Sequence, residues 1–357
     1  MGQEYIWNLS DLKNVPKNGY KVFSCFSCGG GSSMGYKLAG YEVLGNVEID
    51  PAINQMYVKN HHPKYNFLMG VQDFYKPENL PNIPEELYHL DVLDGSPPCS
   101  SYSMAGAREE YWGKEKKFRE GQAKQILDDL FFEFIRVADL LKPKVVIAEN
   151  VKGMVSGNAK GYVNLVRKRF DEIGYDTQLF LLNAATMGVP QRRERVFFIC
   201  RRKDLDMPKV VISCNKKPIT YGEFADEDYK PLNKDTLNYA RWCRRKVGDR
   251  GIGDTVKRTE NGKISGFTVT YIYRNEVPPT LTASGNHIRF DKPGYPSARD
   301  IKIIQTFPQD YDFCGNDPAY VCGMSVPPFM MREVAKSVAM QLLPYAKETE
   351  NGEEKAG

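Results

Sequence analysis

Short apolar runs alternate with segments of helical periodicity over the first two hundred residues of the chain. Two segments, 122–141 and 163–174, carry apolar residues at the spacing of one helix face, and the second ends on a glycine suited to a helix C-terminus. Strands that alternate with helices predict an α/β fold with a doubly wound, mainly parallel sheet. The apolar runs that predict its strands lie at 21–26, 41–50, 90–98, 142–151, 175–184 and 195–200.

This pattern stops after Cys200. Residues 201–296 are polar and basic, rich in glycine and tyrosine, and without steady periodicity, which predicts a second, smaller and irregular domain. A helical pattern returns at 327–343, and its apolar face would need the sheet of the first domain as a partner. We therefore expect residues 297–346 to complete a first domain that begins with 1–200, and the polar tail at 347–357 to be disordered.

Composition narrows the class of protein. The chain has 357 residues, 41% of them hydrophobic and 26% charged, which is the balance of an ordinary globular protein. It has no run of eighteen apolar residues and its start lacks the pattern of a secretory signal, so we expect a cytoplasmic protein without a membrane span. The net charge is +4, and the surplus of lysine and arginine lies mainly in the irregular segment. This indicates either a polyanionic partner such as nucleic acid or a solvated surface.

A glycine-rich turn, FSCGGG at 26–31, follows the first predicted strand. Glycines let a backbone approach a ligand closely, and Glu48 at the end of the second predicted strand could accept hydrogen bonds from ribose hydroxyls. The alternative is a tight turn with no ligand. Cys25 and Cys28 form a lone CxxC pair without a second pair to complete a metal site, so we expect no metal. His61 and the histidine after it are expected to be solvent-facing or structural.

Reactive side chains gather at the ends of three other predicted strands. Cys99 follows two prolines in DGSPPCSSYS, at a strand end where open parallel sheets place their ligands. Glu149 follows the apolar run VVIA, so its carboxyl group is expected to lie in a pocket of low polarity that favours the protonated form. Arg193 and Arg195, two residues apart in QRRERV, share one face of an extended chain. A nucleophilic cysteine, a proton-handling glutamate and paired arginines predict covalent catalysis.

Six motifs occur in the order found in DNA cytosine-5 methyltransferases, and through them the chain resembles this family over nearly its whole length. They are FSCGGG, SPPC, ENV, QRRER, RDIKIIQTFPQDY and GMSVPP. The resemblance implies a Rossmann-like domain that binds S-adenosylmethionine and a target-recognition domain at 201–296. It also implies cofactor contacts from Phe26, Cys28, Gly29, Gly30, Gly31, Glu48, Ile49, Ser96, Pro98, Ser325 and Val326.

The resemblance further implies a mechanism. The thiolate of Cys99 would add to C6 of a cytosine flipped out of duplex DNA, while Glu149 would hydrogen-bond or protonate N3. Arg193 and Arg195 would support the base and the cysteine motif, with Arg195 as the better candidate for the base. C5 would then receive the methyl group, and loss of the C5 proton would release Cys99. The segment at 100–121 would form either a mobile loop that closes over the base or a merely solvated loop.

Duplex DNA is the partner that the resemblance implies, with 241–251 (RWCRRKVGDRG) as the main contact to phosphates. A restriction endonuclease would act separately, and the enzyme would be a monomer. Three alternatives stay open: a tRNA methyltransferase of the same fold, a non-catalytic DNA- or cofactor-binding relative, and a nucleotide-dependent oxidoreductase.

Several positions depart from the family pattern without removing a catalytic group. The acidic residue that usually precedes the phenylalanine of the cofactor loop is absent. Other positions carry a residue type that the family does not usually have, namely Cys28, Ile49, Gly70, Ser100 and Met324. We therefore expect the catalytic chemistry to be retained and the cofactor contacts to differ in detail.

Overall fold

The computed structural model describes residues 3–98, 115–116, 125–126, 130–155, 160–260, 269–285 and 287–346. Cys99 and the tail at 347–357 lie outside this part of the chain. So does most of the expected loop at 100–121, of which only β5 (Glu115–Lys116) is described, paired with β6 (Gln125–Ile126).

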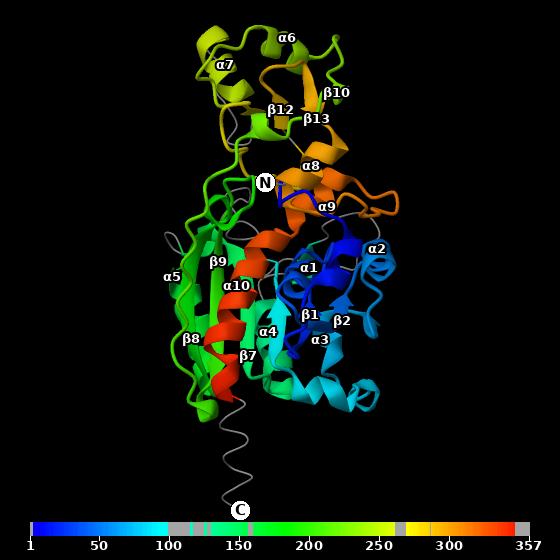
Figure 1. Ribbon diagram of the computed structural model, residues 1–357, viewed down its shortest axis with the longest axis vertical. Coiled ribbons are helices and arrows are strands. Elements are labelled where there is room, and N and C mark those ends of the chain that lie inside the picture. Colours follow the sequence, from blue (N-terminus) through cyan, green and yellow to red (C-terminus); the bar gives the residue numbers. More distant parts are fainter. Residues whose placement is uncertain are drawn as a thin grey trace, which may run out of the picture.

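A seven-stranded sheet forms the body of the molecule (Figure 1). Its order is β3-β2-β1-β4-β7-β9-β8, and neighbours are parallel except that β9 runs antiparallel to both β7 and β8. The predicted α/β fold with a mainly parallel sheet is confirmed. The chain passes from β1 toward β3 on one side and then returns to β4 on the other side of β1. Open α/β sheets bind ligands at such a reversal. The strands are β1 (Lys21–Cys25), β2 (Glu42–Glu48), β3 (Tyr65–Leu68), β4 (Val92–Gly95), β7 (Val145–Val151), β8 (Tyr175–Asn183) and β9 (Glu194–Arg202).

Alternate side chains of the strands build one hydrophobic core on each side of the sheet. Helices α1, α2 and α10 pack on the side where Val22, Val92 and Ile147 point, which we call the α10 face. Helices α3, α4 and α5 pack on the side of Phe23, Leu93 and Val146, which we call the α4 face. These helices are α1 (Gly31–Leu38), α2 (Pro51–His61), α3 (Val71–Phe74), α4 (Leu130–Leu141), α5 (Lys160–Glu172) and α10 (Pro328–Gln341).

Helix α10 lies beside α1, although the two are far apart in sequence (Figure 1). A Cβ atom on Gly35 of α1 would lie 2.5 Å from the Cβ of Met331 and 2.6 Å from the carbonyl oxygen of Pro328, so only glycine permits this approach. The hydroxyl of Tyr41 also donates to the carbonyl oxygen of Ala335 at 3.0 Å. The helix predicted at 327–343 is therefore confirmed. Its apolar face packs on the seven-stranded sheet, as predicted.

Two predicted elements differ from the structure. The helix expected over 122–141 is observed only as α4 (Leu130–Leu141), because Gln125–Ile126 pair with another strand. The short strand β3 was absent from the predicted set. It lies at the sheet edge and alternates between exposed and partly buried residues, so it lacks the continuous apolar run that marks the central strands.

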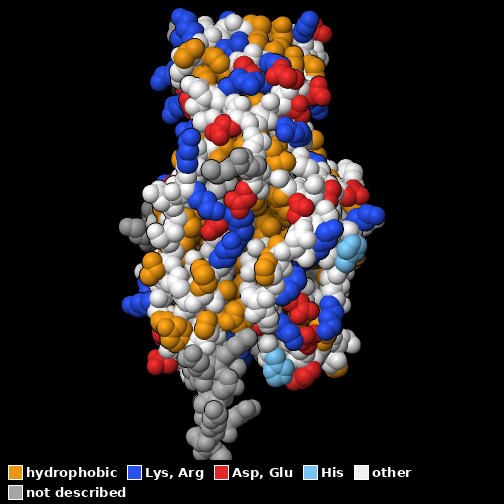
Figure 2. Space-filling view, viewed as in Figure 1, with side chains coloured by type: hydrophobic (Ala, Val, Ile, Leu, Met, Phe, Trp, Pro, Cys, Tyr) orange, Lys and Arg blue, Asp and Glu red, His pale blue; other side chains and the backbone are white. Residues whose placement is uncertain are grey.

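A smaller unit lies beyond the carboxyl ends of the parallel strands (Figure 1). Its own apolar cluster contains Leu232, Ile252, Tyr271 and Ile288. Figure 2 shows lysine and arginine side chains on this upper unit, interspersed with acidic and apolar ones. Its helices and strands, with the two helices that lead back to the sheet, are α6 (Leu237–Cys243), α7 (Ile252–Thr259), β10 (Tyr229–Pro231), β11 (Thr270–Ile272), β12 (His287–Arg289), β13 (Gly294–Pro296), α8 (Ala298–Gln305) and α9 (Pro318–Met324).

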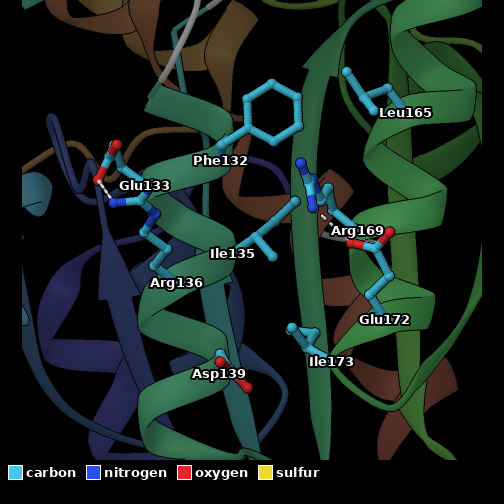
Figure 3. A pocket seen from close by; sticks show the side chains of 9 residues that line it. All are labelled: Phe132, Glu133, Ile135, Arg136, Asp139, Leu165, Arg169, Glu172 and Ile173. Carbon is cyan, nitrogen blue, oxygen red and sulfur yellow. Dashed lines mark hydrogen bonds and ion pairs between the residues drawn. The ribbon is translucent and has the colours of Figure 1, made fainter.

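Within the described residues, no helix combines the length and apolar character that crossing a membrane requires. A pocket of about 490 Å³ lies between α4 and α5, on the α4 face (Figure 3). Four of its charged side chains pair within the lining, Arg169 with Glu172 at 2.7 Å and Arg136 with Glu133 at 3.9 Å, while Asp139 pairs with Lys142 outside it. The lining residues are Phe132, Glu133, Ile135, Arg136, Asp139, Leu165, Arg169, Glu172 and Ile173.

Candidate active site

The glycine-rich turn connects β1 to α1 at the reversal in strand order. Phe26 and Cys28 have positive φ angles of 56° and 46°, a strained backbone for side chains of these types. Gly30 also has a positive φ of 70°, and a Cβ there would lie 2.1 Å from the Nε2 atom of His61. At Gly31 a Cβ would lie 2.0 Å from the carbonyl oxygen of Val326. The turn is thus clamped between α2 and the segment before α10, and each of these contacts requires glycine.

Glu48 fixes this turn to the end of β2. Its carboxylate accepts hydrogen bonds from the backbone amides of Cys28 at 3.0 Å, Ile49 at 2.9 Å and Asp50 at 3.0 Å. Burial raises the pKa of Glu48, and the three amides oppose that effect. On the other side of the turn, the hydroxyl of Ser325 lies 3.7 Å from the sulfur of Cys28. The turn, Glu48, Ile49 and the segment at 325–326 therefore lie together. That they contact the cofactor, as the resemblance implies, stays a prediction.

Glu149 and Arg195 form a buried ion pair at the ends of β7 and β9. The Nε atom of Arg195 lies 2.9 Å from Oε1 of Glu149, and their side chains are only 14% and 9% exposed. Apart from this ion pair, Oε1 of Glu149 has no partner within the described chain. Burial lowers the pKa of Arg195, and the charge of Glu149 raises it. A carboxyl oxygen with no partner besides a cation can exchange a proton with a bound base.

Asn150 joins this pair to the segment that carries Cys99. Its amide nitrogen donates to the carbonyl oxygen of Pro97 at 3.1 Å, and its amide oxygen accepts from the backbone of Val151 at 2.9 Å. Ser96 and Pro98, two of the predicted cofactor contacts, belong to the same segment after β4. Asn150 was named in the sequence only as part of ENV, and no role was inferred for it.

The hydrogen bonds of Arg193 differ from those of the Glu149–Arg195 pair, although burial and the charges of both residues act on its pKa. Its guanidinium group is buried and donates to the carbonyl oxygens of Leu281 at 2.9 Å, Gly323 at 3.0 Å and Ser325 at 3.1 Å. These bonds join the residue before β9 to two distant segments. The support of the base and the cysteine motif that the resemblance implies for Arg193 stays a prediction. Within the described residues its hydrogen bonds reach backbone groups and not a carboxylate.

The cysteines and histidines near the turn serve packing. Burial raises the pKa of the Cys28 thiol to about 12, which leaves it protonated at neutral pH. His61 is buried and stacks on Tyr57 with ring centroids 4.3 Å apart. No group of histidine, cysteine and carboxylate side chains suited to a metal ion occurs in the described part of the chain.

Asp94, at the end of β4, is a buried carboxyl group that the sequence analysis did not assign. It accepts hydrogen bonds from the hydroxyls of Ser24 at 2.8 Å and Tyr36 at 3.3 Å. Burial raises its pKa from 3.8 to about 7, with the charge of Glu149 acting in the same direction and the hydroxyls opposing it. An acidic residue at the end of an apolar strand, as in LDVLDG, was the signal that could have identified it.

Replacing Asp94 with asparagine is expected to stabilise the fold at alkaline pH. Because the folded pKa is raised, the stability that protonated Asp94 contributes is present below pH 4 and is lost as pH rises toward 7. Asparagine carries no charge and avoids this loss. Urea denaturation measures the free energy of unfolding of both proteins. The difference, variant minus wild type, should increase by roughly 2 kcal/mol from pH 5.5 to pH 8. An equal difference at both pH values would contradict the expectation.

Comparison with known proteins points to one family. Residues 20–340 match the C-5 cytosine-specific DNA methylases. The type II methyltransferase M.NgoPII of Neisseria gonorrhoeae is 30% identical over 351 residues, which cover 91% of this chain and 97% of that protein. The type II methyltransferase M1.HphI of Haemophilus parahaemolyticus is 29% identical over 337 residues, which cover 88% and 85%.

Solved structures agree in fold. A prophage-encoded DNA modification methyltransferase from E. coli has a TM-score of 0.65 at 20% identity, covering 90% of this chain and 99% of that one. A DNMT2 variant of Spodoptera frugiperda has a TM-score of 0.62 at 18% identity, with the same coverage. Together with the sequence match over residues 20–340, this shows that the chain belongs to the C-5 cytosine-specific DNA methylase family.

Proposed function

We propose that this DNA cytosine-5 methyltransferase methylates one short sequence in duplex DNA, with Cys99 as nucleophile and S-adenosylmethionine as methyl donor. The observation that carries the proposal is the buried Glu149–Arg195 pair, which Asn150 connects to the segment that leads into Cys99. Addition of a thiolate to a cytosine ring requires a proton donor near the base, and Glu149 lies on the strand next to β4, the strand that leads into the Cys99 segment.

The chain's own residues account for the steps. The thiolate of Cys99 forms a bond to C6, and the ring electrons displaced by this bond are accommodated as Glu149 gives a proton to N3. Arg195 holds the Glu149 carboxyl group in place and stabilises the carboxylate that remains. The cofactor supplies the methyl group that C5 receives. N3 returns its proton to Glu149 as C5 takes the methyl group. The C5 proton then passes to solvent water while the C5–C6 double bond forms again and the C6–S bond breaks, which releases Cys99 as a thiolate.

The residues around the turn fit this cofactor. The carboxylate oxygens of Glu48 can accept further hydrogen bonds beside the backbone at 28–31. Ile49 and Phe26 offer apolar surface next to Glu48 and the turn. We assign the cofactor contacts to Phe26, Cys28, Gly29, Gly30, Gly31, Glu48, Ile49, Ser96, Pro98, Ser325 and Val326.

The smaller unit is proposed to contact DNA through 241–251. Part of its positive charge is already compensated, because Arg241 and Arg244 pair with Glu260 and Arg250 pairs with Asp254. Arg245 lies 3.3 Å above the ring of Trp242, which holds its guanidinium group in a fixed place. We propose that these pairs orient the arginines toward the phosphates and that the enzyme acts as a monomer, apart from any restriction endonuclease.

Bisulfite sequencing of DNA from cells that express the protein tests this function. Protected cytosines within one short motif, lost in a Cys99→Ser control, are the expected result. Absence of protection in both samples would contradict it. Labelled methyl transfer to total tRNA would then distinguish an RNA methyltransferase from a non-catalytic binding protein.

Replacing Glu48 with alanine is expected to weaken binding of S-adenosylmethionine by about 10–100-fold, because the turn loses its hydrogen bond from Cys28 to the carboxylate and the chain after β2 loses the bonds from Ile49 and Asp50. Isothermal titration calorimetry with the purified protein measures the change. Glu42→Ala is the matched control, since Glu42 is exposed at the start of the same strand. Equal affinity of the two variants would exclude Glu48 from the cofactor site.

A further inference from the structure

Gln72 lies just beyond the carboxyl end of β3, next to the strand end that carries Glu48. Leu68, the last residue of β3, is the partner of Glu48 in the parallel register of β2 and β3. Gly70 follows two residues later, and the short helix α3 that begins after it packs against β2. Because the carboxyl ends of parallel strands lie at the same edge of a sheet, the glycine-rich turn, Glu48 and Gln72 follow one another along the ends of β1, β2 and β3.

The carboxamide of Gln72 folds back over Gly70. A Cβ atom on Gly70 would lie 2.4 Å from Nε2 and 2.6 Å from Oε1 of Gln72, so the amide occupies the space that a side chain at position 70 would fill. Gly70 is also one of the positions at which this chain departs from the family pattern. The lack of a side chain at this position therefore leaves room for the amide of Gln72.

The Oε1 atom of Gln72 is buried and has no hydrogen-bond partner among the described residues. A buried carbonyl oxygen without a donor costs free energy, and such atoms in native proteins usually have a partner. The acidic side chains that follow β2 and β3 are already engaged, since Asp50 caps helix α2 and Asp73 pairs with Lys76 at 2.5 Å. A buried acceptor that lacks a donor, at the edge where such sheets bind ligands, indicates a donor on a ligand.

We propose that Gln72 binds the adenine of the cofactor, with Oε1 accepting a hydrogen bond from the exocyclic amine of the base. The inference rests on the cofactor proposed above. A nucleoside whose ribose lies at Glu48 can extend its base along the row of strand ends either toward β1 or toward β3. The glycine-rich turn and the segment at 325–326 occupy the β1 side. The base therefore extends toward β3, whose end lies one strand spacing of about 4.8 Å away.

A carboxamide matches adenine at two neighbouring atoms. Its oxygen accepts from the amine and its nitrogen donates to a ring nitrogen, as glutamine does when it binds adenine in DNA. Ile49, partly buried beside Glu48, offers apolar surface to the ring. A carboxylate in the place of Gln72 could only accept hydrogen bonds and would add a charge. Gln72 thus selects adenine over a purine without the amine, and it does so as a neutral group.

Isothermal titration calorimetry of the full chain with S-adenosylhomocysteine, the cofactor without its methyl group, tests the inference in the absence of DNA. The wild type is expected to bind this ligand about tenfold more tightly than an analogue whose purine carries hydrogen in place of the amine. Gln72→Met keeps the length of the side chain but has no amide. This variant should bind S-adenosylhomocysteine about tenfold more weakly than the wild type and distinguish the two ligands by less than about twofold.

Gly70→Ala tests the placement of the amide. Its methyl group would displace the end of a flexible side chain and not the backbone, so the variant should fold and yet lose the same discrimination between the ligands. Gln55→Met is the control, because Gln55 is exposed on α2, and it should bind both ligands as the wild type does.

The comparison of the two ligands on the wild type requires no variant to fold. Equal affinity of the wild type for both ligands would overturn the inference, as would undiminished discrimination in Gln72→Met. A wild type that binds neither ligand would overturn the proposed cofactor as well, so the two failures are distinguishable.

Discussion

Replacing Glu149 with glutamine is expected to lower the single-turnover rate of cytosine methylation by about a thousandfold. Glutamine has nearly the same size and can still donate a hydrogen bond to N3 of the base. It cannot transfer a proton, so the ring would have to accept the Cys99 thiolate while N3 stays unprotonated. The glutamine side chain also loses the charge attraction to Arg195, whose Nε lies 2.9 Å from the carboxyl oxygen.

Transfer of a labelled methyl group to duplex DNA, with enzyme in excess, measures this rate directly. Glu194→Gln is the matched control, because Glu194 lies near the same strand ends but is 42% exposed and pairs with Lys152. Its rate should remain within about twofold of the wild type. A Glu149 variant that retains more than a tenth of the wild-type rate would show that protonation of N3 is not provided by this residue.

Replacing Arg193 with alanine is expected to lower the free energy of unfolding by about 3–5 kcal/mol. The substitution removes three charge-assisted hydrogen bonds and leaves the carbonyl groups of Leu281, Gly323 and Ser325 without their donor. It also opens a cavity where a side chain only 2% exposed had been. The loss should reduce cofactor affinity as well, since Ser325 packs against the glycine-rich turn.

Urea denaturation followed by far-ultraviolet circular dichroism measures this stability. Arg192→Ala, the adjacent arginine with a side chain 55% exposed, should change it by less than about 0.5 kcal/mol. Similar midpoints for the two variants would mean that the buried guanidinium group does not hold the distant segments together. A direct role of Arg193 at the base would instead lower the methylation rate of a variant that remains stable.

The strand ends that carry two of the proposed catalytic groups could be predicted because each has a strong local signal. Glu149 follows the apolar run of β7 and Arg195 precedes the apolar run of β9, so each could be placed at a strand end; the two meet because β9 runs antiparallel to β7. The antiparallel direction of β9 could not be predicted, because alternation of side chains is the same for both directions of a strand.

Contacts between residues that are far apart in the sequence could not be predicted. Arg193 belongs to the same motif as Arg195, yet its side chain donates hydrogen bonds to segments about 90 and 130 residues away. No local sequence pattern predicts such partners. Asp94 was quoted as part of the cysteine stretch without a role, since its meaning depends on lying beside Ser24 in the sheet. Asn150 is similar, because its bond to Pro97 appears only when β4 and β7 are neighbours.

The contact between α1 and α10 has a consequence for synthesis of the protein on the ribosome. Helix α1 begins at Gly31, whereas the helix that covers it ends at Gln341. At roughly 5–20 residues per second, the ribosome needs about 15 to 60 seconds to make the intervening chain. During this interval the apolar residues Met34 and Tyr36 lack their partner helix. The surface of α1 that α10 covers in the folded protein therefore lacks this cover until the last helix emerges.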